Sequence, residues 1–499
     1  MALTNADYRD IQGLLRYGYG RLAEACFLLL RIDDPAAASR WLEAAPVTTA
    51  EEQNPPPVRA LQLAFTCEGL RKLGISEDQL NNFSAEFISG MSGDENRSRR
   101  LGDVGASSPE YWQWGGPADV PDLVAMIYAQ RGQLAEWQST TEDGLKASGF
   151  KLLRCLPTTD MGGVEPFGFV DGVSEPKLDW ERRRNGAGDK LSYENVSMLG
   201  EFVLGYPNEY GKYTGRPTIM AQEVGDLPPA EDLPGFKDIG RNGTYLVIRQ
   251  IEQDVRSFWQ FIDAQVDRDA SKRQDLAEKM VGRQMSGDPL LPKMTQTIAG
   301  VGPDTQDVLR NQFTFDSDVD GIRCPFGAHV RRANPRNADY PTGTHGLVAR
   351  FVRLLGFGRK SMREDIVAST RFHRLLRRGR EYGTKLSPDQ RLQPPSPGES
   401  PSGLQFVCLN ANIARQFEFI QSAWLMSGKF DGLSEESDPL LGNREVIAGY
   451  PVDRFSLPID GGVRQQIRGL PRFTTVRGGA YFFLPGVRAL RYLARAARV

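Results

Sequence analysis

The feature that most constrains the fold of this chain is an internal repeat. Two stretches, FLLLRIDDPAAASRW (27–41) and YLVIRQIEQDVRSFW (245–259), align without a gap. In this alignment Arg31 falls on Arg249, Ser39 on Ser257 and Trp41 on Trp259. Each stretch opens with four apolar residues, typical of a buried strand, and continues through acidic residues into a helical pattern. A strand–helix unit that recurs in this way favours an old duplication.

A second, weaker strand–helix unit occurs in each half of the chain. LQLAFTCEGLRKLG (61–74) provides it in the first half and GLQFVCLNANIARQFEFIQSAW (403–424) in the second. Such units predict an α+β fold of duplicated ferredoxin-like type, with two antiparallel sheets and covering helices. The acidic, proline-rich stretch GDLPPAEDLPG (225–235) predicts the boundary, so the halves are 1–235 and 236–499.

Composition excludes several classes of protein. The 499 residues carry a net charge of −2, so neither a nucleic-acid partner nor an acidic membrane is expected. The start, MALTNADYRD, lacks the pattern of a signal peptide, and the nearby apolar run CFLLLRI is too short to span a bilayer. Because the five cysteines are scattered, they indicate thiols in a reducing compartment, and we predict a cytoplasmic protein.

Motif searches narrow the chemistry further. The chain has no G-x-S-x-G, no P-loop and no H-E-x-x-H, which argues against a serine hydrolase, a P-loop ATPase and a zinc protease. Only three histidines are available: His329, His345 and His373. The turn-like context of His345 predicts an exposed loop, and the basic context of His373 predicts a solvated helical face.

His329 has a different setting, CPFGAHVRRANPR (324–336), with small residues before it and arginines after it. Small neighbours leave room for a flat group to approach. Haem iron needs one neutral imidazole on its proximal face, and arginines can pair with the two haem propionates. From the pattern alone, a structural histidine with satisfied hydrogen bonds is the more common case.

Two further stretches present charged side chains at turns. In GFVDGVSEP (168–176), glycines on both sides of Phe169-Val170-Asp171 permit a sharp turn, and Asp171 either closes that turn or faces a ligand. In LLRRGREYG (375–383), Arg377 and Arg378 precede a glycine. They either end a helix as a basic turn or direct one guanidinium inward to meet developing negative charge.

Together these three stretches resemble the dye-decolorising peroxidase family. GFVDG matches the G-x-x-D-G motif of that family, CPFGAHVRRANPR is similar to its proximal histidine stretch, and LLRRGREYG is similar to its distal arginine stretch. Further familial stretches are IQGLLRYGYG, RNGTYLVIRQIEQDV, QFEFIQSAWL, DPLLG and VRGGAYFFLPG. The resemblance covers nearly the whole chain in order, and the length is similar to that of the larger, cytoplasmic bacterial-type members.

The resemblance implies the fold of that family, haem b as cofactor, and reduction of hydrogen peroxide coupled to oxidation of dyes or phenolic and other aromatic donors. It implies one role for each candidate residue: His329 as iron ligand, Arg331 and Arg336 on the propionates, Leu404 and Phe406 above the distal face, and Asp171 and Arg377 as catalytic residues. Leu404 and Phe406 stand two apart on an expected strand, so they point the same way.

The chain departs from the family pattern at two places. Pro166 stands where relatives often have histidine, and the acidic partner of the proximal imidazole falls on Asn412, with Glu418 close by. Two other functions stay open at this stage: a haem-binding or haem-handling protein with little turnover, and a structural or regulatory protein without cofactor. Self-association into a homo-oligomer also stays open.

Overall fold

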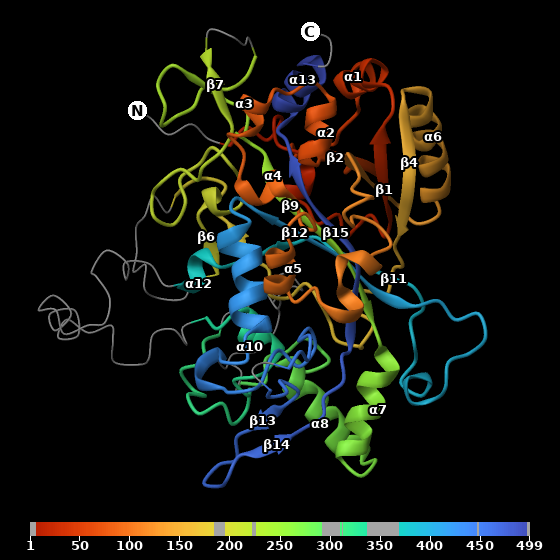
Figure 1. The fold of residues 1–499 in the computed structure, drawn as a ribbon, viewed down its shortest axis with the longest axis vertical. Coiled ribbons are helices and arrows are strands. Elements are labelled where there is room, and N and C mark those ends of the chain that lie inside the picture. The colour runs from red at the N-terminus through yellow and green to blue at the C-terminus, as the bar shows by residue number, and fades with distance from the viewer. Residues whose placement is uncertain are drawn as a thin grey trace, which may run out of the picture.

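The computed structural model describes residues 6–183, 195–221, 226–291, 310–311, 313–336, 369–446 and 449–496. Its centre is a nine-stranded sheet with antiparallel pairing throughout, in the order β10-β12-β9-β15-β2-β3-β1-β4, and β11 also pairs with β12 (Figure 1). The strands are β1 (Glu24–Ile32), β2 (Arg59–Phe65), β3 (Leu123–Ala129), β4 (Phe150–Pro157), β9 (Thr244–Gln253), β10 (Leu376–Arg377), β11 (Arg380–Tyr382), β12 (Ser402–Asn410) and β15 (Thr474–Leu484). The expectations for His345 and for the basic stretch 348–365 fall outside the described residues.

Helices from both halves of the chain pack against this sheet (Figure 1). Those of the first half are α1 (Pro35–Ala44), α2 (Cys67–Lys72), α3 (Glu77–Leu80), α4 (Ala85–Ser89), α5 (Glu95–Leu101) and α6 (Leu134–Ala147). Those of the second half are α7 (Val255–Gln265), α8 (Ala270–Val281), α10 (His329–Ala333), α12 (Ser369–Phe372), α13 (Val487–Ala496) and the π-helical segments η7 (Ala414–Glu418) and η8 (Ile420–Met426). Small two-stranded sheets lie outside the main one: β5 (Lys177–Leu178) with β6 (Val196–Ser197), β7 (Thr218–Met220) with β8 (Phe236–Asp238), and β13 (Phe455–Leu457) with β14 (Gln465–Ile467).

The predicted repeat is present as two strand–helix units. β1 leads into α1 and β9 leads into α7, and an aspartate caps each helix. Asp34 accepts a hydrogen bond from the N–H of Ala37 at 3.0 Å, and Asp254 accepts one from the N–H of Ser257 at 2.9 Å. The second units are β2 with α2, and β12 with η7 and η8. The expected α+β fold with antiparallel sheets is confirmed.

The two expected sheets are joined edge to edge. β15 pairs with β9 on one side and with β2 on the other, where Phe483 lies opposite Phe65. This junction covers strand edges that would otherwise expose unpaired backbone groups. Both faces of the joined sheet are apolar: along β1, Leu28 packs in one buried cluster and Phe27 and Leu29 pack in another. The strands therefore appear as continuous apolar runs in the sequence.

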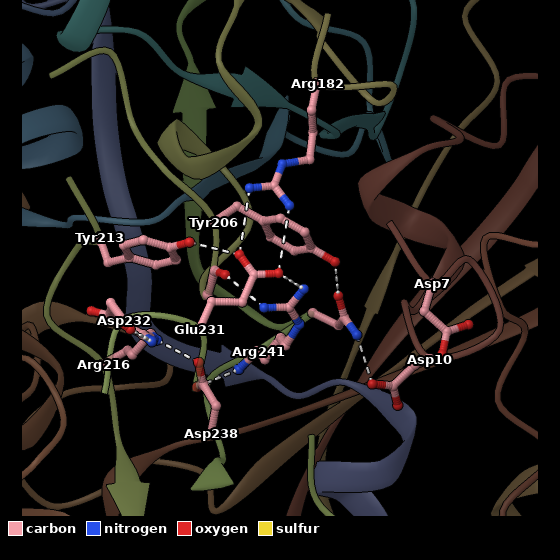
Figure 2. A network of polar contacts seen from close by, with 12 residues as sticks. Asp7, Asp10, Arg182, Tyr206, Tyr213, Arg216, Glu231, Asp232, Asp238 and Arg241 are labelled. Carbon is pink, nitrogen blue, oxygen red and sulfur yellow. Dashed lines mark hydrogen bonds and ion pairs between the residues drawn. The ribbon is translucent and has the colours of Figure 1, made fainter. Parts of the chain in front are cut away.

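The acidic stretch predicted as the boundary is held by buried ion pairs (Figure 2). Glu231 accepts hydrogen bonds from Arg241 at 2.7 Å and from the hydroxyl of Tyr213 at 2.6 Å. Asp232 of the stretch pairs with Arg216, which in turn pairs with Asp238 at 2.5 Å. The described part of this stretch is thus anchored to the segment that leads into β9, and the boundary between the halves stays a prediction.

In the described part of the chain, every helix is too short or too polar to cross a lipid bilayer.

Candidate active site

Five of the candidate residues line one cavity, which lies beside strands β9, β10 and β12. Part of its wall comes from the sheet: Ile251 of β9, Arg377 of β10 and Leu404 and Phe406 of β12. The remaining wall includes the GFVDG loop, α10, η8 and the turn after Asp438, with the lining residues Phe169, Val170, Asp171, His329, Val330, Ile420, Leu425, Leu440 and Leu441. The structure therefore brings together Asp171, His329, Arg377, Leu404 and Phe406, which lie far apart in the sequence.

Asp171 and Arg377 form an ion pair in this cavity. Arg377 Nη1 donates to Asp171 Oδ1 at 2.8 Å, and the N–H of Gly172 donates to the same oxygen at 2.6 Å. Burial by itself would raise the pKa of Asp171, but the charge of Arg377 and these hydrogen bonds outweigh it and lower the pKa below its ordinary value. Asp171 is therefore an anion under all but strongly acidic conditions.

Glu175 orients Arg377 and was not singled out from the sequence. Arg377 Nε lies 2.9 Å from Glu175 Oε1, and the backbone N–H of Arg377 donates to Glu175 Oε2 at 2.8 Å. The guanidinium is thus held between two carboxylates, Asp171 and Glu175. The available signal was the acidic residue four places after Asp171 within GFVDGVSEP.

The expectation that Arg377 lies at a helix end is wrong, because LLRRGREYG forms β10 and β11 at the sheet edge. β10 pairs with β12 so that Arg377 lies opposite Cys408. The next arginine, Arg378, donates from its side chain to the backbone oxygen of Leu14 at 3.0 Å. Alternation along the strand therefore sends the two arginines in different directions.

The two glycines of the GFVDG loop have different roles. Gly168 has a φ of +109°, and a Cβ there would meet Arg391 Nη1 at 2.4 Å. Gly168 thus makes room for the guanidinium of Arg391. Gly172 has a φ of +79° with no neighbouring atom within 4 Å of a Cβ. Its requirement for glycine is conformational.

His329 begins α10, and a buried carboxylate fixes its ring. Nδ1 lies 2.9 Å from Oδ2 of Asp438, which is 0% exposed. The other oxygen of Asp438 accepts the N–H groups of Leu440 and Leu441 at 2.9 and 2.8 Å. Burial alone would lower the pKa of His329, but the charge and hydrogen bond of Asp438 raise it. With Nδ1 committed to a carboxylate, Nε2 is the nitrogen available to a metal, as in many metal-binding histidines.

The sequence assignment of the imidazole partner is wrong. The side-chain oxygen of Asn412 instead accepts the backbone N–H of Arg415 at 2.8 Å. Glu418 pairs with Arg97 at 2.8 Å and accepts the hydroxyl of Tyr481 at 2.9 Å. Both side chains are thus engaged elsewhere. The acidic partner of the His329 ring is Asp438.

The structure does not support Arg331 and Arg336 as partners of an acidic cofactor edge. Neither lines the cavity. Arg331 pairs with Asp318 at 3.1 Å and donates to the backbone oxygen of Cys324 at 2.7 Å. Arg336 donates to the backbone and side-chain oxygens of Asn311 at 2.7 and 2.8 Å. Both guanidiniums therefore bind backbone oxygens near His329 outside the cavity lining. The arginines that do line the cavity are Arg249, Arg283, Arg374, Arg377 and Arg472.

His373 also differs from its expectation of a solvated helical face. It is 8% exposed, lines the cavity and stacks on Phe419 with ring centroids 3.6 Å apart. Its Nδ1 is hydrogen-bonded to the backbone oxygen of Arg415. Burial lowers the pKa of His373 to about 4, so the ring is neutral at physiological pH. A basic local sequence does not reveal such aromatic stacking.

No family model matches the chain, but the curated relatives that it resembles are all named as peroxidases. It is 28% identical over 348 residues to the multifunctional dye peroxidase DyP2 of Amycolatopsis, covering 68% of this chain and 62% of that protein. It is 26% identical to Peroxidase 2 of Mycetinis scorodonius, covering 98% of this chain and 88% of the relative. It is equally identical to the dye-decolorizing peroxidase AauDyP1 of Auricularia auricula-judae, covering 98% of this chain and 87% of the relative. Over nearly its whole length, the chain is thus similar to dye-decolorising peroxidases.

Solved structures of dye-decolorising peroxidases share the fold. A crystal structure of the enzyme from Auricularia auricula-judae has a TM-score of 0.72 and 21% identity, covering 99% of this chain and 100% of the other. The peroxidase of Anabaena has a TM-score of 0.68 and 21% identity, covering 97% and 94%. Another solved member has an engineered haem pocket. This chain thus has the fold of those solved structures.

Proposed function

We propose that this protein is a haem-dependent peroxidase that reduces hydrogen peroxide and oxidises dyes or other aromatic one-electron donors, in the cytoplasm. The observation that carries the proposal is that one cavity contains both the His329–Asp438 pair and the Asp171–Arg377 pair. The first pair suits axial binding of an iron. The second pair suits proton transfer and charge stabilisation.

The cavity fits haem b by the chemistry of its donors. His329 would provide the nitrogen that binds the iron, and apolar side chains such as Leu404, Phe406 and Leu440 would contact the macrocycle. Arg283 and Arg374 replace Arg331 and Arg336 as candidates for the propionates, because both line the cavity. Bound there, haem supplies the redox-active iron.

The protein's own residues move the proton of hydrogen peroxide. Among the described residues, the hydrogen bonds of the Asp171 carboxylate end on Oδ1, which leaves Oδ2 to take the first peroxide proton. Asp171 then returns the proton to the other peroxide oxygen, so that this oxygen can leave as water when the O–O bond breaks with electrons supplied by bound haem. Arg377, held by Glu175, offsets negative charge on that oxygen. Because burial and the nearby carboxylates fix both groups, little reorganisation is needed during the reaction.

Reconstitution tests this function. The purified protein is titrated with haem and followed by its Soret band, and then hydrogen peroxide and an anthraquinone dye are added. We expect a saturating Soret band at one haem per chain and dye bleaching that requires both haem and peroxide. Free haem at the same concentration is the control. Saturating haem binding with bleaching no faster than free haem would indicate a haem-handling protein instead.

The lowered pKa of Asp171 predicts how the reaction with peroxide depends on pH. The carboxylate must be ionised to accept a proton, and its pKa lies below the ordinary aspartate value of ~3.9. The second-order rate constant for peroxide should therefore stay constant from neutral pH down to about 4 and decline only at lower pH. Stopped-flow measurements in the stable pH range of the protein check this. A decline centred at pH 5 or above would contradict the lowered pKa.

A further inference from the structure

Asp171 stands at the end of a small hairpin that spans residues 163–171. The N–H of Asp171 donates to the oxygen of Gly163 at 3.0 Å, and Val164 bridges Val170. Further in, the N–H of Glu165 donates to the oxygen of Phe169 at 2.9 Å. Placement of the Asp171 carboxylate in the cavity therefore depends on the shape of this hairpin.

The side chain of Glu165 fills the inside of the hairpin. Its Oε1 accepts the N–H of Phe169 at 3.0 Å, and its Oε2 accepts the N–H of Phe167 at 3.0 Å. Oε2 also accepts Nε2 of Gln253, on β9, at 2.8 Å. One carboxylate thus organises the turn from within and ties it to the central sheet. Without it, two N–H groups of the turn would lose their acceptors, which is costly away from water.

We propose that Glu165 is a positioning residue for Asp171, acting through the hairpin and its attachment to Gln253. The inference rests on the proposed function, because it assigns the hairpin the task of holding the peroxide-proton acceptor. Glu165 lines the same cavity, but its two oxygens are committed to three N–H donors. It is therefore suited to holding the loop in place, whereas Asp171 keeps one oxygen available.

The attachment to β9 can persist in both charge states of Glu165. Burial raises its pKa to about 7, with the charge of Asp171 adding to this and the hydrogen bonds opposing it, and Arg391 is the cation that faces it. Gln253 Oε1 is buried and accepts no hydrogen bond from any described residue. When Glu165 is protonated, rotation of the Gln253 amide lets this oxygen accept the new O–H group. The hairpin then stays attached across neutral and acidic pH.

A second set of contacts holds the outside of the hairpin. Nε1 of Trp259, on α7, donates to the oxygen of Phe167 at 2.9 Å. Arg391 packs against Gly168 and lies 5.4 Å from the centre of a Trp259 ring. Because these contacts act on the same turn, Trp259→Phe gives an independent variant that removes the Nε1–H donor together with part of the indole ring.

Hydrogen exchange in the haem-free protein tests the positioning role directly. Glu165→Gln is isosteric, but its amide group places a donor against one of the turn N–H groups. We expect faster exchange in the peptide covering 163–172 and unchanged exchange in β1. Glu252→Gln is the matched control, since Glu252 neighbours Gln253 on β9 and pairs with Arg477 instead. Unchanged exchange in 163–172 for both Glu165→Gln and Trp259→Phe would overturn the inference.

A double-mutant cycle on the haem-loaded protein separates positioning from general loss of structure. We expect Glu165→Gln to lower the second-order rate constant for peroxide by about 10- to 100-fold, as expected when a catalytic group is displaced by about 1 Å. In Asp171→Asn, the same substitution should cause little further loss, because the group it positions is gone. If Asp171→Asn is slow and Glu165→Gln is not, or if the two losses multiply, the positioning role of Glu165 is wrong while the proposed role of Asp171 stands. If Asp171→Asn reacts at the parent rate, the proposed role of Asp171 fails as well.

Discussion

Replacing His329 by alanine is expected to abolish tight haem binding. His329 is the one histidine of the described cavity whose Nδ1 is committed to a carboxylate, which leaves Nε2 for the iron. The other cavity histidine, His373, is packed flat against Phe419. Changing a residue that supports a metal ligand typically costs 10- to 100-fold in metal affinity. Removal of the ligand itself should therefore weaken haem binding by more than ~100-fold.

Haem titration followed by the Soret band measures this loss, with His345→Ala as the control for removal of a histidine. Free imidazole supplies a second check, because it can enter the space left by the missing side chain. We expect millimolar imidazole to restore much of the spectrum of His329→Ala. A His329→Ala protein that binds haem with the parent affinity and spectrum would show that another residue is the axial ligand.

The repeated strand–helix units could be predicted because their signals are local. Four apolar residues followed by a capping aspartate specify a buried strand and the start of a helix within a dozen residues. Asp34 and Asp254 cap their helices as such a pattern requires. The joining of the two sheets depends on β15, whose partners β9 and β2 come from distant parts of the chain. Nothing local to these strands specifies that pairing.

The candidate site could be predicted in part. Asp171, His329 and Arg377 were found because each stands in a short motif, and the fold brings them to one cavity. The sequence does not reveal Asp438 as the partner of His329, although Asp438 begins the stretch DPLLG, because the two residues are 109 positions apart and a hydrogen bond over that separation leaves no trace in motif spacing. A proline and two leucines after an aspartate were the available signal, since that turn supplies the N–H groups that hold Asp438.

The arginines after His329 show why closeness in sequence does not fix direction. Each residue of a helix turns the side chain by about 100°, so Arg331, two positions after His329, points to the opposite side. Arg336, seven positions on, would return to the side of His329 only if the helix continued. However, α10 ends at Ala333, and Arg336 has a φ of +58°. The end of a five-residue helix is decided by its surroundings and not by its own sequence.

The second large effect concerns Asp171 and Arg377 in haem-loaded protein. Asp171→Asn keeps the size of the side chain and removes its ability to accept a proton, so the second-order rate constant for peroxide should fall by ~10²–10⁴-fold. Arg377→Leu removes the cation that faces the departing oxygen, and a fall of ~10²–10³-fold is expected. Arg378→Gln is the matched control, because the side chain of Arg378 bonds to Leu14 and does not line the cavity.

The pH profiles of the two variants should differ, and this difference distinguishes their roles. In Arg377→Leu, Asp171 remains but loses the charge that lowers its pKa, while burial continues to raise it. The ionised form then requires a higher pH, so the acid decline of the rate should move upward. In Asp171→Asn, the group that titrates is absent and that decline should disappear. Stopped-flow rates from pH 3 to 7, with haem content checked at each pH, measure both. Parent rates in both variants would mean that the ion pair only closes the GFVDG turn and takes no part in the reaction with peroxide.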